Sequence, residues 1–237
     1  MAVRETPLER FGAGDLWIKR VPLRFYGMQM GTRMTVVRLD DGGLLIHSPT
    51  AADAGTRAAV DQLGGVRFVV APNRLHHLWV AEWASAYPDA ELWGSPKLLD
   101  KRRDVAWTGA LGDQPEPGWA GAVDQALFGG YDWLSEVVFC HRPSRTLIVA
   151  DLLESTHPDD AWLLRLFGHL GGDFEHPTLT RDQRLLVRDR AAARASVQKI
   201  LAWDFDRIIL AHGRLIEQDG KRVFRDGMRW LGPPASD

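Results

Sequence analysis

The stretch that decides the fold reads Phe68-Val69-Val70-Ala71-Pro72-Asn73-Arg74-Leu75-His76-His77. Its first four residues are apolar and typical of a buried strand, and the loop that follows ends in two adjacent histidines. A rigid strand fixes where the side chains of the next loop point, and imidazole nitrogens bind divalent metals. The stretch therefore predicts a metal-capable loop at the carboxyl end of a buried strand.

Two later apolar runs end in the same way. Residues 147–150 lead into Asp151, and residues 207–211 lead into His212. Two imidazoles and a carboxylate are a common ligand set for zinc, manganese or iron. We therefore expect His77, Asp151 and His212 to form one metal site, assembled from distant parts of the chain. Three protein ligands leave a position open for water, whose pKa a bound ion can lower to about 7.

Other polar residues could complete or flank this site. His76 is either a fourth ligand or points away, because the side chains of neighbouring loop residues tend to diverge. His47 ends an apolar strand and Asp132 lies in a loop before another strand, so both could sit behind the ligands and hold them in place. A hydrogen-bonded turn residue is the alternative for His47. The remaining histidines are expected at the surface: His141, His157, His169 and His176.

The composition predicts one globular domain that spans residues 1–237, with 45% hydrophobic residues. The formal net charge of −2 gives no reason to expect a nucleic-acid partner. No apolar run approaches the roughly 20 residues that cross a membrane, and residues 1–5 lack the apolar segment of a signal peptide. A cytoplasmic protein that acts on a small molecule is therefore expected. Its single cysteine, Cys140, lies in an apolar run and is expected to be a buried, inert thiol.

Strand clusters alternate with helices along the chain. Strands are expected at 16–21, 34–39, 44–47, 66–71, 91–94, 126–128, 136–141, 146–150 and 207–211. Helices are expected at 51–63, 78–87, 96–104, 159–168 and 180–203, and a Gly/Pro-rich loop at 108–121. Each half of the chain has a hairpin, then helix, then a strand that ends in histidine. This order predicts a layered α/β fold.

Several of these stretches together resemble the metallo-β-lactamase superfamily and, within it, the family called domain of unknown function 4336. The matching stretches are Leu44-Leu45-Ile46-His47-Ser48-Pro49, the His76-His77 loop with Trp83, Asp151-Leu152 and His212-Gly213. The resemblance covers about residues 15–230. It implies a four-layer αββα sandwich with a metal site at one edge, between the two sheets.

The resemblance also implies an incomplete metal centre. The first metal-binding loop of the superfamily reads H-x-H-x-D-H, and its four ligand positions fall on Pro72, Arg74, His76 and His77. The superfamily's later Asp and its last His fall on Asp151 and His212, while its middle His has no counterpart in 129–135. The first of two metal sites is thus lost. One divalent ion is expected, with zinc as the first choice and iron or manganese as alternatives.

Three functions are compatible with this reading. The first is a mononuclear metal-dependent hydrolase of an ester, thioester, amide or phosphoester, with Asp151 acting catalytically as ligand and as orienter of the water. In that hypothesis Arg74 binds an anionic group of the substrate; a salt bridge is the alternative for Arg74. The second is a non-catalytic or sensory binding module, which the missing ligands favour. The third is an iron-dependent redox protein.

Overall fold

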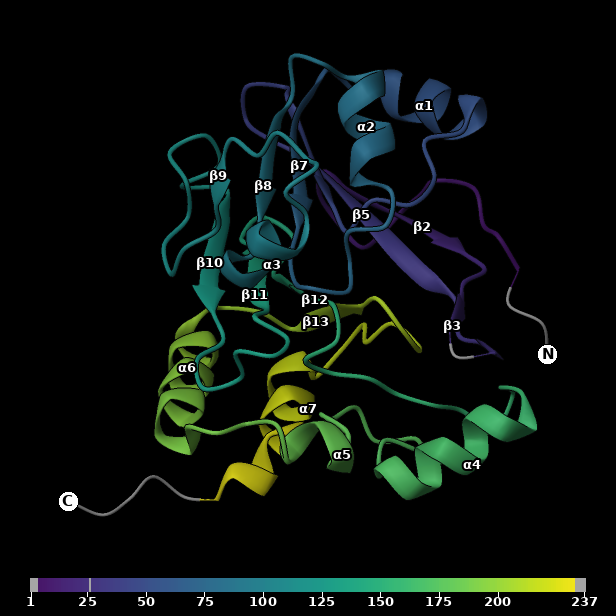
Figure 1. The fold of residues 1–237 in the computed structure, drawn as a ribbon, viewed down its shortest axis with the longest axis vertical. Helices are drawn as coiled ribbons and strands as arrows, with labels where there is room; N and C mark the ends of the chain where they lie inside the picture. The colour runs from purple at the N-terminus through teal and green to yellow at the C-terminus, as the bar shows by residue number, and fades with distance from the viewer. Residues whose placement is uncertain (1–3, 26, 233–237) are drawn as a thin grey trace.

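The chain folds around two β-sheets that pack face to face, as seen in a computed structural model that describes residues 4–25 and 27–232 (Figure 1). In spatial order, the seven strands of the first sheet are β1 (Glu9–Arg10), β2 (Leu16–Val21), β5 (Thr32–Arg38), β6 (Leu44–His47), β7 (Val66–Ala71), β8 (Glu91–Gly94) and β9 (Gly109–Ala110). The four strands of the second are β10 (Val123–Leu127), β11 (Val137–His141), β12 (Thr146–Val149) and β13 (Arg207–Leu210). A small hairpin pairs β3 (Arg24–Phe25) with β4 (Met28–Gln29). The two ends of the expected domain, residues 1–3 and 233–237, lie outside the described residues.

Helices cover the outer faces of both sheets. The first sheet carries α1 (Ala54–Asp61), α2 (Val80–Ala86) and α3 (Pro96–Lys101). The second sheet packs against α6 (Arg190–Ala202) and α7 (Gly220–Gly227), while α4 (Trp162–Gly171) and α5 (Arg181–Arg184) lie lower in the same layer (Figure 1). None of the helices in the described part of the chain is long and apolar enough to cross a membrane.

Three apolar cores hold these layers together. The central core lies between the sheets, where Phe68 and Val70 of β7 pack with Phe139 of β11 and Ile148 of β12. The outer cores lie between each sheet and its helices, for example around Trp83 of α2. The central strands alternate their side chains between these cores, so both faces of each sheet are buried at its centre. The order helix, sheet, sheet, helix is the αββα sandwich that the family resemblance implies.

Parallel pairing brings the loops of the candidate site to one edge. β12 and β13 run parallel with Val149 opposite Leu210, so Asp151 and His212 both follow two residues after a paired position. β6 and β7 also run parallel, with His47 opposite Val70. The carboxyl ends of parallel strands meet at the same edge of a sheet. The topology therefore collects Ser48, the loop after β7, Asp151 and His212 in one region.

Several expected elements differ from the structure. The expected helix 180–203 is two helices, because Asp189 interrupts it and caps α6 by accepting the N–H groups of Ala191 and Ala192 at 2.9 Å each. α7 was not expected, since it begins and ends with glycine and most of its residues are charged or small. The turn-like context of His141 predicted a surface position, and this prediction is wrong, because His141 is buried in β11. Cys140 is buried as expected, and this burial raises the pKa of its thiol to about 12.

Candidate metal site

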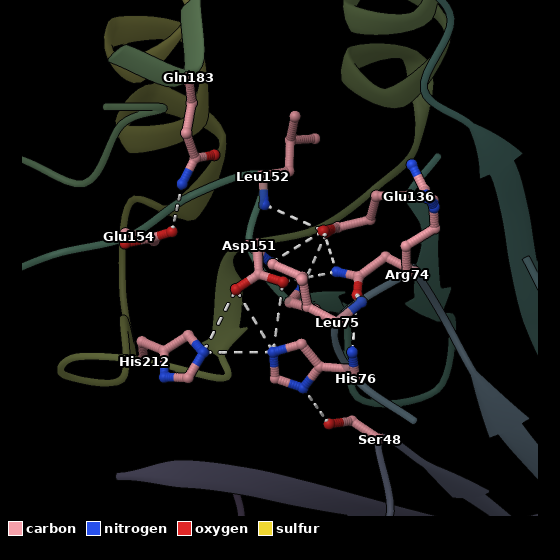
Figure 2. Close-up of polar contacts among 12 residues, drawn as sticks. Ser48, Arg74, Leu75, His76, Glu136, Asp151, Leu152, Glu154, Gln183 and His212 are labelled. Carbon is pink, nitrogen blue, oxygen red and sulfur yellow. Dashed lines mark hydrogen bonds and ion pairs between the residues drawn. The ribbon is translucent and has the colours of Figure 1, made fainter. Parts of the chain in front are cut away.

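Three polar side chains meet at the edge of the sandwich. The Nε2 atom of His76 lies 3.3 Å from both carboxylate oxygens of Asp151 and 3.2 Å from Nε2 of His212. The Nε2 atom of His212 lies 3.2 Å from Oδ1 of Asp151, which closes the triangle seen in Figure 2. All three residues are buried. We call this cluster of His76, Asp151 and His212 the triad.

The two imidazoles are oriented by their other ring nitrogens. His212 Nδ1 lies 2.7 Å from the backbone carbonyl oxygen of Gly31, which can only accept, so Nδ1 carries the proton. In the neutral imidazole, Nε2 then carries the lone pair that can bind a cation, and when Nε2 is protonated instead it donates to Asp151. His76 Nδ1 shares a 2.6 Å hydrogen bond with the hydroxyl of Ser48, whose backbone has a positive φ of 53°. This arrangement, one ring nitrogen held and the other free, is typical of metal-binding histidines.

The charge of the triad also suits a cation. Burial opposes the ionisation of Asp151, but the charge of His76 and the hydrogen bonds from both imidazoles hold its pKa well below its usual range. Burial likewise opposes protonation of His212, but the hydrogen bond and charge of Asp151 raise its pKa overall. The triad thus places an ionised carboxylate between two imidazoles. A cation bound there would take over the role of the protons that otherwise stabilise this carboxylate.

A buried network behind the triad holds two of its members. The side-chain oxygen of Asn73 accepts the N–H groups of Leu75 and His76 at 2.8 and 2.9 Å. The Nδ2 atom of Asn73 donates to Oδ2 of Asp151 at 2.7 Å and to Oε2 of Glu136 at 2.8 Å. Asn73 therefore fixes the backbone of one ligand residue and the carboxylate of another.

Glu136 completes this network at the start of the second sheet. Its carboxylate accepts the N–H groups of Ala150 at 2.8 Å, Asp151 at 2.8 Å and Leu152 at 3.1 Å. Burial and the nearby charge of Asp151 raise the pKa of Glu136 to about 7. Neither Glu136 nor Asn73 was expected from the sequence. The available signal was an acidic residue at the very start of the apolar run 137–140. A buried carboxylate there is costly unless it accepts hydrogen bonds, for example from backbone N–H groups.

His77 does not join the triad, which corrects the expectation that it is the firmer ligand of the pair. Arg102 donates from Nη1 to His77 Nδ1 at 2.8 Å and to its carbonyl oxygen at 3.1 Å. Burial, followed by the charges of Lys101 and Arg102, lowers the pKa of His77 to about 4. The backbone N–H of His76 donates to Asn73. With the loop held in this way, the side chain of His76 faces Asp151 and that of His77 faces Arg102.

The remaining predicted residues lie apart from the triad. His47 is buried between the sheets, edge-on to Phe139 with ring centroids 5.2 Å apart, and burial lowers its pKa to about 3. Its neighbour Ser48, and not His47 itself, touches the triad. Arg74 points away from the triad (Figure 2) and donates to the carbonyl oxygen of Trp133 at 3.0 Å. Asp132 lines a cavity together with Arg74.

The triad fits a single divalent ion. One ligand atom from each of the three residues lies within 4.8 Å of the other two. Two imidazole nitrogens and a carboxylate oxygen are a usual donor set for zinc, iron or manganese. Within the described residues, the triad is the one group of at least three His, Cys, Asp or Glu side chains placed to hold a metal ion.

Two facing sheets with helices outside and a His/Asp cluster at one edge define a metallo-β-lactamase fold. The chain belongs to the family described as Domain of unknown function (DUF4336), whose profile matches residues 14–166. Among curated proteins, none matches this chain in sequence.

Solved structures agree on the fold. A metallo-β-lactamase from Pontibacter korlensis superimposes with a TM-score of 0.66 at 11% identity, over 96% of this chain and 99% of that one. FIM-1 from Pseudomonas aeruginosa, in its mono-zinc form, gives 0.62 at 12% identity over 98% of each chain. The flavodiiron core Flv1 from Synechocystis sp. PCC6803 gives 0.60 at 14% identity, over 97% of this chain and 61% of that one. Identities this low establish the fold and not the activity.

Proposed function

We propose that this protein is a hydrolase that works with one divalent metal ion held by His76, Asp151 and His212. The observation that carries the proposal is the triad itself, with three donor atoms within 4.8 Å of one another. Zinc is the first choice, and iron or manganese are alternatives. The substrate is a small molecule with an ester, thioester, amide or phosphoester bond.

The roles of the residues follow from their hydrogen bonds. A bound divalent ion supplies Lewis acidity toward water and toward the carbonyl or phosphoryl oxygen of the substrate. Asp151 would hold the ion and accept a hydrogen bond from the attacking water, which fixes the direction of attack. Asn73 keeps the Asp151 carboxylate from rotating, because it donates to Oδ2. Gly31 and Ser48 keep the two imidazole rings in the orientation that an ion requires.

Arg74 remains a candidate for binding an anionic group of the substrate. Arg74 lies two residues before His76 in the sequence, but its guanidinium is directed away from the triad (Figure 2). If it binds substrate, Arg74→Ala should raise KM for anionic substrates and leave KM for neutral ones unchanged. An equal loss on both would contradict this role.

Metal analysis tests the proposed function directly. We expect about one equivalent of metal per chain after reconstitution, and its loss in His76→Ala, Asp151→Ala and His212→Ala. His169→Ala, at an exposed histidine, is the control and should keep its metal. Hydrolysis of a panel of ester, thioester, amide and phosphoester substrates should disappear with the metal.

Two other results would redirect the proposal. A parent protein that binds no metal under any reconstitution would favour the non-catalytic binding module instead. Bound iron with a visible absorbance and no hydrolysis would favour redox chemistry.

A further inference from the structure

A cavity of about 490 Å³ opens beside the loop 129–135. Its walls include Arg74, Trp133, Leu186 and Arg188, and the triad residues do not line it. The cavity thus combines two guanidinium groups with an aromatic and an aliphatic side chain. The hydrolase proposed above uses Arg74 as a candidate substrate contact and gives no role to the other three residues.

Backbone contacts hold the walls of the cavity in place. The N–H of Arg74 donates to the carbonyl oxygen of Leu134 at 3.1 Å, and the N–H of Arg188 donates to that of Gly130 at 2.9 Å. Gly130 has a φ of +77°, and a Cβ atom there would lie 2.0 Å from the carbonyl oxygen of Asp189. The chain therefore approaches itself at Gly130 in a way that only glycine allows.

The two arginines have unused donor capacity. Arg74 donates from Nη1 to Trp133, but its Nε is buried without a hydrogen-bond partner. The Arg188 side chain has no hydrogen bond or ion pair among the residues that the structure describes. An anionic oxygen in the cavity can accept charge-assisted hydrogen bonds from the accessible guanidinium nitrogens that have no partner.

The acidic residues of the wall only partly oppose this charge. Asp189 uses its carboxylate to cap α6, since Oδ1 accepts two backbone N–H groups at 2.9 Å. Asp132 is exposed and is the one wall carboxylate that is not committed to a helix end. The wall therefore carries two positive and two negative charges, and the case for an anion rests on the guanidinium donors that have no partner rather than on the net charge.

The apolar part of the wall is fixed and accessible. Trp133 is 46% exposed and Leu186 is 38% exposed. Tyr131, which is buried, stacks on Trp133 with ring centroids 6.2 Å apart and an angle of 21°. A large aromatic side chain that is held from behind and open in front is suited to contact a flat or apolar group.

We propose that this cavity binds a small organic anion, in which a carboxylate or phosphate meets Arg74 and Arg188 and a flat or apolar group meets Trp133 and Leu186. Binding needs no metal, so the proposal goes beyond the proposed hydrolase. The further step, that the bound anion is the substrate, rests on the proposed function.

Calorimetric titration of the metal-free protein tests the proposal. The probes are phenyl phosphate and benzoate, which combine an anion with a ring, and inorganic phosphate and benzyl alcohol, which each carry one of the two features. We expect phenyl phosphate or benzoate to bind at least about tenfold more tightly than both single-feature probes. Which of the two binds identifies the anion. No binding of either probe at millimolar concentration would overturn the proposal.

Variants assign the contacts. Arg74→Met and Arg188→Met should each weaken binding of the preferred probe about tenfold, whereas Arg57→Met on α1 should not change it. Arg188 is exposed and its side chain makes no hydrogen bond or ion pair within residues 4–25 and 27–232, so its variant tests the site even if Arg74→Met fails to fold. Asp132→Asn should strengthen binding. Unchanged affinity in Arg188→Met would contradict the proposal.

One variant separates this site from the metal site. His212→Ala should lose metal and keep the affinity for the preferred probe. A parent protein that binds the probe but takes up no metal on reconstitution would refute the hydrolase and leave the anion site standing, and one that takes up metal but does not bind the probe would do the reverse.

Discussion

The Nε2 atoms of His76 and His212 lie 3.2 Å apart. Two protonated imidazoles at this distance would repel each other, so the pair favours one shared proton or one bound cation. A cation that binds only the folded protein stabilises it by about 4 kcal/mol at a concentration 1,000 times its Kd. We expect zinc, manganese or iron to raise the Tm above that of chelator-treated protein, measured by circular dichroism. A Tm that is equal with and without metal would argue against the site.

The adjacent histidines offer a matched pair of variants. His76→Ala should abolish the rise in Tm with metal, because it removes a member of the triad. His77→Ala should keep it, because His77 faces Arg102. The opposite result would show that the loop after β7 presents the other histidine to the ion.

Asn73 should matter for metal affinity although it is not a member of the triad. Asn73→Ala removes the hydrogen-bond partner of two backbone N–H groups and one partner of each of two carboxylates, which costs about 1–3 kcal/mol of unfolding free energy. Loss of a residue that orients metal ligands typically lowers metal affinity about 10- to 100-fold. Calorimetry with the metal and urea unfolding measure the two effects.

Gln125 provides the control for that variant. It is also a buried amide, and its Nε2 donates to the carbonyl oxygens of Gly112 and Gln114 at 2.9 Å each. Gln125→Ala should lower the unfolding free energy by a similar amount and leave metal affinity unchanged. Equal losses of affinity in the two variants would mean that Asn73 acts only through general stability.

Buried His141 should make the protein less stable in acid. Burial lowers its pKa to about 4, from an ordinary value of 6.5. Between these values the unfolded chain binds the proton and the folded chain does not. The unfolding free energy therefore falls as the pH drops through this window, by up to about 1.4 kcal/mol per pH unit, and this contribution levels off below about pH 4.

His141→Asn should give a shallower pH dependence over that window, measured by urea unfolding. Asparagine can still bond with Ser144, which now shares a 2.8 Å hydrogen bond with His141 Nδ1. The slope should not vanish, because burial also lowers the pKa values of His47 and His77. His176→Asn, at an exposed histidine, should leave the slope unchanged, and an identical slope in His141→Asn would contradict the assignment.

Gly130 should tolerate a side chain less well than another glycine of similar backbone conformation. Gly130 and Gly42 have φ values of +77° and +83°, so alanine at either position costs about 1–2 kcal/mol. Only at Gly130 does the new Cβ meet a backbone atom, the carbonyl oxygen of Asp189, whereas Gly42 has open space. Urea unfolding should show a larger loss for Gly130→Ala than for Gly42→Ala. Equal losses would mean that the two chain segments separate easily.

Most of the longer strands could be predicted because their residues carry local signals, whereas the two-residue strands, such as Gly109–Ala110 inside the expected loop 108–121, were not predicted. Residues 66–71 and 91–94 are apolar, rich in strand-forming side chains and bounded by glycine, and the structure has strands with those bounds. The split of the expected helix 180–203 also had a local signal in Asp189, a preferred capping residue, but helical spacing on both sides concealed it.

The choice between His76 and His77 had no such local signal. Both follow the same strand, and which side chain turns inward depends on Asn73, whose amide is held by Glu136 and Asp151 from 63 and 78 residues away. Contacts of this kind form only when the two sheets pack. The strand ends therefore allowed Asp151 and His212 to be predicted from the sequence, whereas the choice of His76 as their partner could not be predicted.

The members of the triad are far apart along the chain, since His76 is 75 residues from Asp151 and 136 from His212. With its single cysteine, the chain has no means of forming an internal disulfide. An ion bound to the triad would close loops of this length and so act as a reversible covalent-like tether between the two sheets. Unlike a disulfide, such a tether exists only while the chain is folded, so it adds its binding free energy to the folded state, and a chelator could remove it without breaking a bond of the polypeptide.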